Sequence, residues 1–411
     1  GQVIRPALLW NDTRSAGAAV DLIAEFGAEQ LADRTGLVPV ASFTITKLRW
    51  LRDHEPELFD RAARFVGIKE YVLFRLTGKY LIDYSLASAT GLFNIRKRAW
   101  DVYTLRYLGV DAQRLSEPVS PYHTEPLPEG NRLGLPAGTP LVIGASDGCL
   151  ANLGSGAVVP GTMAVTIGTS GAVRISAAEA YTDAEMRTFC YILDEKTYIV
   201  GGATNNGAVV FQWLKDMFFA DMEFDDLLAE AGKIGVGSEG LLCLPYLLGE
   251  RAPLWNSAVR GGFVGMDIFH KGPHFVRAVM EGILLNMYSI GHVFMENQTI
   301  HTIYANGGFA KSELWVQMLA DIFGVTVNLN DTVETGSVGA AMMGLKALGY
   351  IKDYKDTAEF TPISRIFTPR ADQHEKYRQL YVHFMEWAQI LTVQSRKKTT
   401  RRALFPEPPS R

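Results

Sequence analysis

The chain is predicted to be an α/β protein of two domains. Its 411 residues, 47% of them apolar, are enough to bury two hydrophobic cores. In the second half, apolar segments with strand character alternate with segments of helical periodicity, a pattern typical of sheets that bind ligands where their strands end. No repeat with a period of about 20 to 50 residues is found, which argues against a solenoid.

Composition excludes several classes of function. Charged residues make up 20% of the chain, the net charge is −4 and the pI is about 6.1, so no basic face for a nucleic-acid partner is expected. The three cysteines, at 149, 190 and 243, are scattered, which favours structural thiols in a reducing cytoplasm. The eight histidines show no zinc-binding spacing, so no metal-ligating side chain is predicted.

The sequence also argues against a membrane partner. No uninterrupted apolar run reaches the ~18 residues of a membrane span, and the N-terminus lacks the basic and apolar regions of a signal peptide. We therefore expect a cytoplasmic protein.

The first half is predicted to be mainly helical. Residues 7–10 have the pattern of a short buried strand, and the polar residues 11–15 fit either a strand-end binding segment or a solvated turn. Residues 83–90 fit both a site loop and a helix start. Helical periodicity is found over residues 16–32, 46–52, 56–66 and 68–76. A connector with five prolines and three glycines follows at residues 115–138.

The second half supplies the alternating pattern. An apolar run at 241–248 leads into Gly-Glu-Arg-Ala-Pro-Leu-Trp-Asn at 249–256, and Gly339 with its small neighbours would let a helix approach another closely. Strands are predicted at 163–167, 198–200, 301–305 and 325–329, and helices after Gly207, at 275–296, from Ser312 and at 377–392. The predicted domains are 1–155 and 156–392, followed by a basic, disordered tail at 393–411.

Two strand ends carry the residues with the clearest chemical meaning. Asp147 follows the apolar strand 141–143, and the small-residue turn 168–171 follows strand 163–167. Phosphoryl transfer needs a base for a hydroxyl proton and backbone N–H groups for phosphate oxygens. Each feature also has a plainer interpretation, because Asp147 could cap a helix and residues 168–171 could form an ordinary hairpin turn.

Several dispersed motifs carry a family resemblance. Gly-Gly-Phe-Val-Gly-Met at 261–266 is followed, after seven residues, by His-Phe-Val-Arg-Ala-Val-Met-Glu at 274–281. Gly-Gly-Phe-Ala-Lys-Ser-Glu-Leu-Trp stands at 307–315, and Glu334 precedes Gly-Ala-Ala at 339–341. With these motifs the chain resembles the FGGY family of carbohydrate kinases from about residue 8 to 384. The resemblance implies a two-domain, actin-like (ribonuclease H-like) ATPase fold.

The resemblance also implies roles for single residues. Asp147 matches the general base that deprotonates the sugar hydroxyl attacking the γ-phosphate of ATP. The positions that match the sugar pocket are Trp10, Asn11, Asp12, Arg14 and Ser42. The positions that match the nucleotide site are Gly168, Thr169, Gln212, Gly308 and Ser312. The implied partners are a sugar or sugar acid and ATP with Mg²⁺, with no nucleic acid and no membrane; a homodimer is a candidate assembly that the sequence does not decide.

Within the family, the residues do not decide between gluconate and a ketose such as xylulose as the substrate. Segments 67–71, 83–88, 144–148 and 249–256 are similar to gluconate kinases, whereas 10–15 and 35–39 are equally similar to xylulose kinases. The carboxylate of gluconate would need a cation, for which Arg14 and Lys69 are candidates. D-gluconate to 6-phosphogluconate is the expected reaction, with xylulose or another ketose as the alternative.

The opening strands of the family, with their Asp-Gly-Thr-Thr-like phosphate hairpin, have no match in this chain. We therefore expect the first domain to be incomplete, and phosphoryl transfer by residues 1–411 to be weak or absent. This departure favours a second class of function, a non-catalytic actin-like protein that binds nucleotide or sugar. A dehydrogenase is set aside, because no GxGxxG follows a strand with an acidic residue ~20 positions later.

Overall fold

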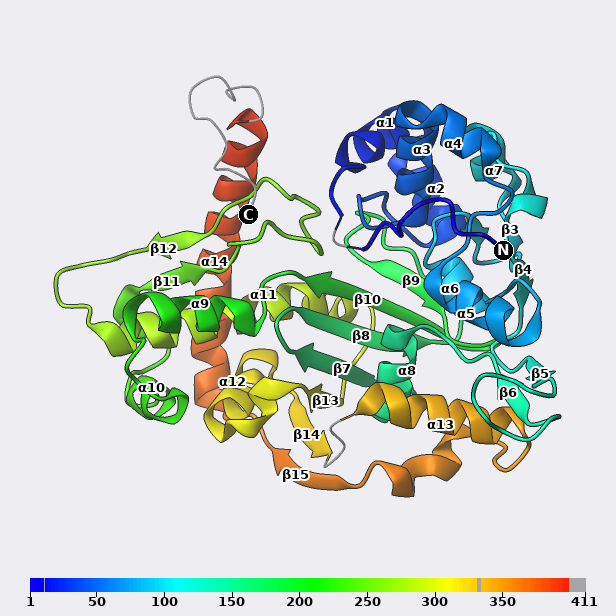
Figure 1. Ribbon diagram of the computed structural model, residues 1–411. Helices are drawn as coiled ribbons and strands as arrows, with labels where there is room; N and C mark the ends of the chain where they lie inside the picture. The colour runs from blue at the N-terminus through cyan, green and yellow to red at the C-terminus, as the bar shows by residue number, and fades with distance from the viewer. Residues whose placement is uncertain (11, 331–333, 399–411) are drawn as a thin grey trace. The chain divides into compact units, whose positions relative to one another are not determined.

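The computed structural model describes residues 1–10, 12–330 and 334–398 and divides into two compact units (Figure 1). The first unit contains residues 1–160, 176–200 and 334–361. The second contains residues 161–175, 201–333 and 362–411. The predicted boundary at 155/156 stays a prediction, and each unit is described by itself.

The first unit is mainly helical, with short strand pairs. Its helices are α1 (Ala16–Phe26), α2 (Ala28–Thr35), α3 (Thr44–His54), α4 (Pro56–Arg61), α5 (Ile68–Thr77), α6 (Tyr84–Ser88), α7 (Val102–Leu108), α8 (Asp147–Gly154) and α13 (Thr335–Ala347), with 3₁₀ turns η1 (Ala112–Arg114) and η4 (Tyr354–Phe360). Its strands are β1 (Leu81–Asp83) parallel to β4 (Glu117–Val119), the antiparallel pairs β2 (Phe93–Asn94) with β3 (Ala99–Trp100) and β5 (Thr124–Pro126) with β6 (Pro140–Val142), and β9 (Phe189–Ile192).

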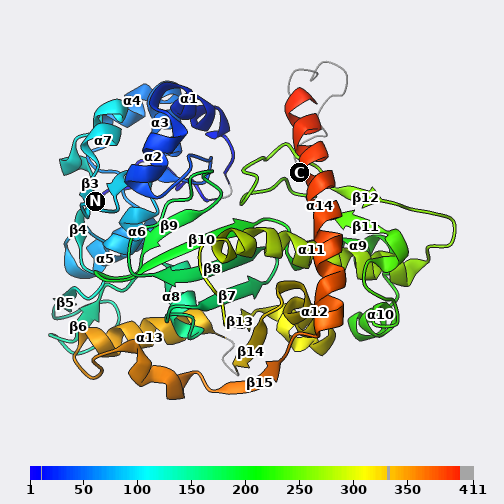
Figure 2. The same ribbon diagram turned by 180° about the vertical axis from the view of Figure 1, so that it is seen from behind.

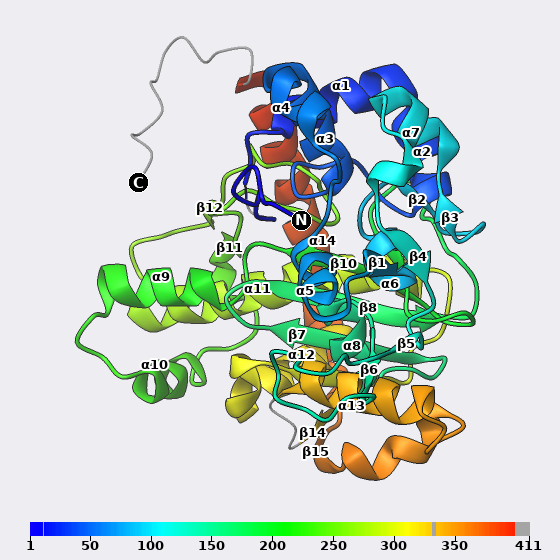
Figure 3. The same ribbon diagram turned by 45° about the vertical axis from the view of Figure 1, so that its right-hand side comes forward.

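Two large apolar clusters help to hold this unit together. One packs α1, α2, α3, α4 and α7 around fully buried side chains such as Leu22 and Leu108. Each such side chain contributes about 1.5–3 kcal/mol by leaving water. The other packs α8 against α13 around Cys149 and Met343, and Figure 3 shows these two helices near each other. The approach of α13 to a neighbour, predicted from its small residues, is confirmed for Gly339, whose added Cβ would lie 1.9 Å from the carbonyl oxygen of Leu150.

In this unit a predicted strand and a predicted continuous helix were wrong, and one open alternative is decided. Residues 7–10 form no strand, and Leu9 and Trp10 expose 60% and 62% of their surface, so the apolar run there is not a buried one. The helix predicted at 16–32 is broken at Gly27, whose φ of 87° lies where helices cannot continue. Residues 83–90 form a helix start, because the carboxylate of Asp83 accepts a hydrogen bond from the N–H of Leu86 (2.8 Å).

The second unit is built on a sheet. Its strands are β7 (Thr162–Ile167), β8 (Gly171–Ala177), β10 (Tyr198–Thr204), β11 (Leu242–Leu244), β12 (Gly262–Val264), β13 (Thr302–Asn306), β14 (Thr326–Asn330) and β15 (Ile363–Phe367); β8 ends and β10 begins in residues of the first unit. Its helices are α9 (Ala208–Phe218), α10 (Phe224–Ala231), α11 (Gly272–Met295), α12 (Glu313–Phe323) and α14 (Ala371–Lys398), with 3₁₀ turns η2 (Ser238–Gly240) and η3 (Gly308–Lys311).

The strand order is β15-β14-β13-β7-β8-β10, and β9 lies beside β10. Strands β7, β13 and β14 are parallel, whereas β8 returns antiparallel to β7 and β15 antiparallel to β14. Parallel neighbours end at the same edge, so the carboxyl ends of β7 and β13 are adjacent. The predicted α/β class is confirmed.

Helix α11 is the buried core helix of this unit and lies beside α9 (Figure 3). Among the described residues it is the one helix long and apolar enough to pass a test for a membrane span, but 89% of the tested window is buried within the protein. Its polar residues Arg277 and Glu281 pair inside the unit at 2.9 Å. Length and composition alone are therefore weak grounds for a span here.

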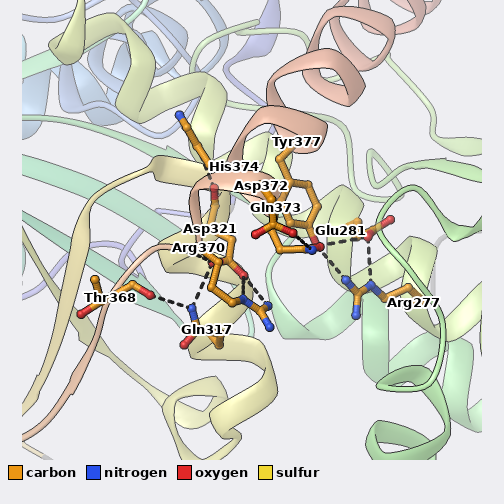
Figure 4. A network of polar contacts seen from close by, with 10 residues as sticks. All are labelled: Arg277, Glu281, Gln317, Asp321, Thr368, Arg370, Asp372, Gln373, His374 and Tyr377. Atoms are coloured by element: carbon orange, nitrogen blue, oxygen red, sulfur yellow. Dashed lines mark hydrogen bonds and ion pairs between the residues drawn. The ribbon is translucent and has the colours of Figure 1, made fainter.

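Helix α14 lies against α11 and α12 (Figure 2), where a polar network fixes it. Near its start, the guanidinium of Arg370 pairs with the fully buried carboxylate of Asp321, while Tyr377 contacts both Arg277 and Glu281 (Figure 4). The helix continues to Lys398, beyond the predicted end at 392, and buried Ser395 accepts a hydrogen bond from the amide of Asn256 (2.8 Å). The rest of the predicted tail, 399–411, lies outside the described residues.

Candidate functional site

Asp147 stands at the first residue of α8 with its side chain exposed. Ser146 occupies the N-cap position, and Oδ1 of Asp147 accepts a hydrogen bond from the N–H of Gly148 (2.6 Å). A negative charge in the first helical turn is favoured by the helix dipole. Asp147 is therefore not the N-cap residue that the plainer interpretation proposed, and its exposed carboxylate can take a proton from a ligand hydroxyl.

The turn that carries Asp147 is tied to two other elements of the first unit. The ammonium of Lys69 on α5 lies 2.6 Å from the buried carboxylate of Asp83 and donates a second hydrogen bond to the carbonyl oxygen of Ala145 (3.2 Å). The hydroxyl of Ser85 on α6 accepts a hydrogen bond from the N–H of Ser146 (3.1 Å) and donates one to its hydroxyl (3.0 Å). The backbone just before Asp147 is thus held in place on both sides.

The predicted sugar-pocket residues Asp12 and Arg14 form one cluster in the first unit. Their side chains pair at 2.9 Å, and the guanidinium of Arg14 lies 5.2 Å from the ring centroid of Trp50. The hydrogen bonds from Arg14 hold the pKa of the Asp12 carboxyl below its usual value. Lys47 donates a hydrogen bond to the carbonyl oxygen of Leu9, and burial lowers the pKa of its ammonium.

The structure gives fewer contacts for the other residues of the predicted sugar pocket. The hydroxyl of Ser15, next to Arg14, donates to the carbonyl oxygen of Ala41 (2.9 Å), which brings half-buried Ser42 to the same part of the unit. Trp10 is largely exposed, and Asn11 lies outside the described residues.

The predicted nucleotide residues gather at one edge of the sheet in the second unit. Gly168 and exposed Thr169 follow β7, and Gly308 follows β13, which runs parallel beside β7 with Asn306 opposite Thr166. The two turns are in close contact, since an added Cβ on Gly307 would lie 2.3 Å from the carbonyl oxygen of Ile167. The sequence placed these residues far apart, and the fold brings them together.

Gln212 and Ser312 reach this edge through the starts of their helices. The N–H of Ala208, the first residue of α9, donates to the carbonyl oxygen of Gly168 (2.8 Å), and exposed Gln212 lies one turn further along, where it donates to Asp216 (2.7 Å). Ser312 caps α12 by accepting a hydrogen bond from the N–H of Trp315 (3.3 Å). Their predicted contacts with nucleotide stay predictions.

No three His, Cys, Asp or Glu side chains of the described residues come together as a metal-binding group. We therefore assign no side chain to Mg²⁺. In kinase sites this ion takes much of its coordination from substrate phosphates and water, so we expect it to arrive as part of the Mg–ATP substrate.

Sequence reasoning missed one feature of the second unit. The carboxylate of Glu250 in the 249–256 motif is buried and accepts hydrogen bonds from Thr204 at the end of β10 and from Asn206 in the loop before α9. The available signal was an acidic residue between Gly249 and Arg251 directly after an apolar run.

Comparison with known proteins identifies the family. Residues 1–154 match the N-terminal domain, and residues 163–348 the C-terminal domain, of the FGGY family of carbohydrate kinases. The gluconokinase of Bacillus subtilis is 38% identical over 94% of this chain and 79% of its own length. Two solved structures from Lactobacillus acidophilus, a ligand-bound xylulose kinase and a gluconate kinase, each superpose with a TM-score of 0.93 and 32% identity over 96% of this chain and 82% of their own.

These matches cover both domains and confirm the predicted two-domain, actin-like fold. They also confirm the predicted enzyme class, a kinase that uses ATP. The chain belongs to the FGGY family of carbohydrate kinases.

Proposed function

We propose that this kinase transfers the γ-phosphoryl group of ATP to a hydroxyl of D-gluconate, giving 6-phosphogluconate, with Asp147 as general base. The observation that carries the proposed mechanism is the exposed Asp147 carboxylate on a turn fixed by Lys69 and Ser85. A base held in this way can accept the hydroxyl proton without first having to be ordered.

The proposal assigns the phosphates to the turn at Gly168 and Thr169. Backbone N–H groups of small-residue turns bind phosphate oxygens. Because the N–H of Gly168 donates to the carbonyl oxygen of Ser170 (2.9 Å), the N–H of Thr169 is the candidate here, and the glycine leaves room for close approach. Gly308 and Ser312 at the adjacent strand end are assigned to the adenosine part of ATP. Mg²⁺ would neutralise charge on the transferring phosphate when it arrives with ATP.

Gluconate is proposed because of the 38% identity to a gluconokinase. The candidate for its carboxylate is Arg14, since the ammonium of Lys69 is already paired with Asp83 at 2.6 Å. Arg14 keeps 46% of its side chain exposed beside Asp12. A xylulose kinase that superposes as well as a gluconate kinase makes a ketose the second candidate. The cytoplasmic location, a homodimer, the weak transfer expected of residues 1–411 and the non-catalytic alternative stay predictions.

A substrate comparison tests the proposal. Initial rates of ADP formation are measured with Mg–ATP and with D-gluconate, D-xylulose or glycerol as acceptor, and the product is identified by phosphorus NMR. We expect kcat/KM for gluconate to exceed that for xylulose at least tenfold, because one charged hydrogen bond contributes about 1.5–3 kcal/mol. A higher value for xylulose would reject gluconate in favour of the ketose.

A further inference from the structure

Glu250 is a buried acid whose role the proposed chemistry leaves unexplained. Glu250 is 2% exposed, and five hydrogen-bond donors of the second unit are aimed at its two oxygens. Oε2 accepts from Thr204 Oγ1 (2.6 Å), Asn286 Nδ2 (2.7 Å) and Asn206 Nδ2 (3.2 Å), and Oε1 accepts from the backbone N–H groups of Arg251 (2.7 Å) and Asn205 (3.3 Å).

Five donors call for an acceptor with several lone pairs, which an ionised carboxylate supplies. Burial raises the pKa of Glu250, while the bonds from Thr204 and Asn206 act in the opposite direction by favouring the charged form. A neutral glutamine would place an NH₂ group against donors that already point inward. The pocket around Glu250 is therefore specific for a carboxylate, not merely for a side chain of that size.

Three of the donors belong to the segment that enters α9. The side chain of Asn206 is fully buried and also binds the backbone next to Glu250, through the carbonyl oxygen of Gly249 (2.6 Å) and the N–H of Leu248 (3.1 Å). The hydroxyl of Thr204 accepts a hydrogen bond from the N–H of Asn206 (2.9 Å). Glu250 thus fixes the backbone from Thr204 to Asn206.

The next residue, Gly207, lies directly on the turn assigned to the phosphates. An added Cβ there would come within 2.6 Å of the carbonyl oxygens of both Gly168 and Ser170. After it, the N–H of Ala208 donates to Gly168 O (2.8 Å) and that of Val209 to Thr169 O (3.2 Å). The position of the turn is therefore set by the backbone that follows Asn206.

We infer that Glu250 is a positioning residue for nucleotide binding: its carboxylate holds the 204–207 segment against the 168–171 turn and so fixes the N–H groups that bind the phosphates of ATP. This inference rests on the proposed function, which assigns the phosphates to that turn. Glu250 touches no substrate in this account and acts through Thr204 and Asn206.

The test compares nucleotide binding by two variants that each neutralise one buried carboxylate. Glu250→Gln should raise the Kd for ADP, measured by calorimetry, and the KM for ATP about tenfold or more, because it leaves buried donors unpaired. The KM for the sugar should stay within about twofold. Glu281→Gln is the matched control: Glu281 is 1% exposed in the same unit but binds Arg277, Gly237 and Ser238, so its ADP affinity should match wild type.

Circular dichroism would reveal whether the Glu250→Gln variant misfolds. Two milder substitutions at Thr204 keep the inference testable in that case. Thr204→Val removes one donor at nearly constant shape and should weaken ADP binding in the same direction, while Thr204→Ser should restore it. Unchanged ADP affinity in folded Glu250→Gln or in Thr204→Val, or an equal loss in Glu281→Gln, would overturn the inference. A wild-type protein that binds no ADP would overturn the proposed function and the inference together.

Discussion

The ammonium of Lys69 lies 2.6 Å from the carboxylate of Asp83, whose side chain is fully buried. The same ammonium binds the carbonyl oxygen of Ala145, two residues before Asp147. This ion pair joins α5 to the start of α6. Through the bond to Ala145, it also fixes the backbone next to Asp147, the proposed base.

Lys69→Met should destabilise the protein by about 2–4 kcal/mol at pH 7, because it leaves the buried Asp83 carboxylate without its cation. Urea unfolding measures the loss, and the double variant with Asp83→Asn should recover at least half of it. If Lys69 instead bound the substrate carboxylate, Lys69→Met would raise the KM for gluconate but not for xylulose. We expect the ratio of the two KM values to stay the same.

Arg14→Met should raise the KM for gluconate about tenfold or more and leave the KM for xylulose within about twofold, because only gluconate carries a carboxylate for the guanidinium. Asp12→Asn is the companion variant: it removes the partner that competes for Arg14 at 2.9 Å and should lower the KM for gluconate. An equal change in KM for both substrates in Arg14→Met would show that Arg14 does not bind the carboxylate of gluconate.

Gly339→Ala should destabilise the protein by about 3 kcal/mol, because its Cβ would lie 1.9 Å from the carbonyl oxygen of Leu150 where α13 crosses α8. Thermal unfolding gives the value. Gly344→Ala on the same helix is the control: its Cβ would meet nothing within 4 Å, so it should stabilise the helix by up to about 1 kcal/mol. A Gly339→Ala variant as stable as wild type would contradict the close crossing.

Glu55 gives a pH-dependent prediction. Its carboxylate binds Arg5 through two hydrogen bonds of 2.8 Å, which hold the pKa of Glu55 below its usual 4.5. A lowered pKa stabilises the folded state above pH ~4.5, and this contribution is lost as the pH falls through the folded-state pKa. Glu55→Gln should therefore cost about 1 kcal/mol or less at pH 7 and nothing at about pH 2, as measured by urea unfolding. A difference between the two proteins that persists at pH 2 would be inconsistent with this ion pair.

Much of the second unit was predictable because it is built from local patterns. Strands β7, β13 and β14 and helices α11 and α12 follow from apolar periodicity, and the Ser312 cap from its position before a helical run. The proximity of Gly168 to Gly308 needed the parallel pairing of β7 with β13, which joins residues about 140 positions apart and leaves no local signal.

The first unit was less predictable because tertiary contacts decide its local structure. Residues 7–10 look like a buried strand, yet Trp10 is exposed and the segment is held by Lys47. The pairing of Lys69 with Asp83 joins residues 14 positions apart and has no local sequence signal, so Lys69 stood beside Arg14 as a candidate for the substrate carboxylate. Likewise, Glu250 is functional in our account only through donors that the fold brings from three separate segments.

The role of Asp147 as general base is tested by the rate of phosphoryl transfer from ATP to gluconate, compared between Asp147→Asn and wild type. Asp147 is exposed, so the variant should keep the wild-type melting temperature and bind ADP and gluconate within about twofold. Its kcat should fall about 10²–10⁴-fold, which is the usual contribution of a general base. Wild-type turnover of gluconate by folded Asp147→Asn would show that Asp147 is not the general base.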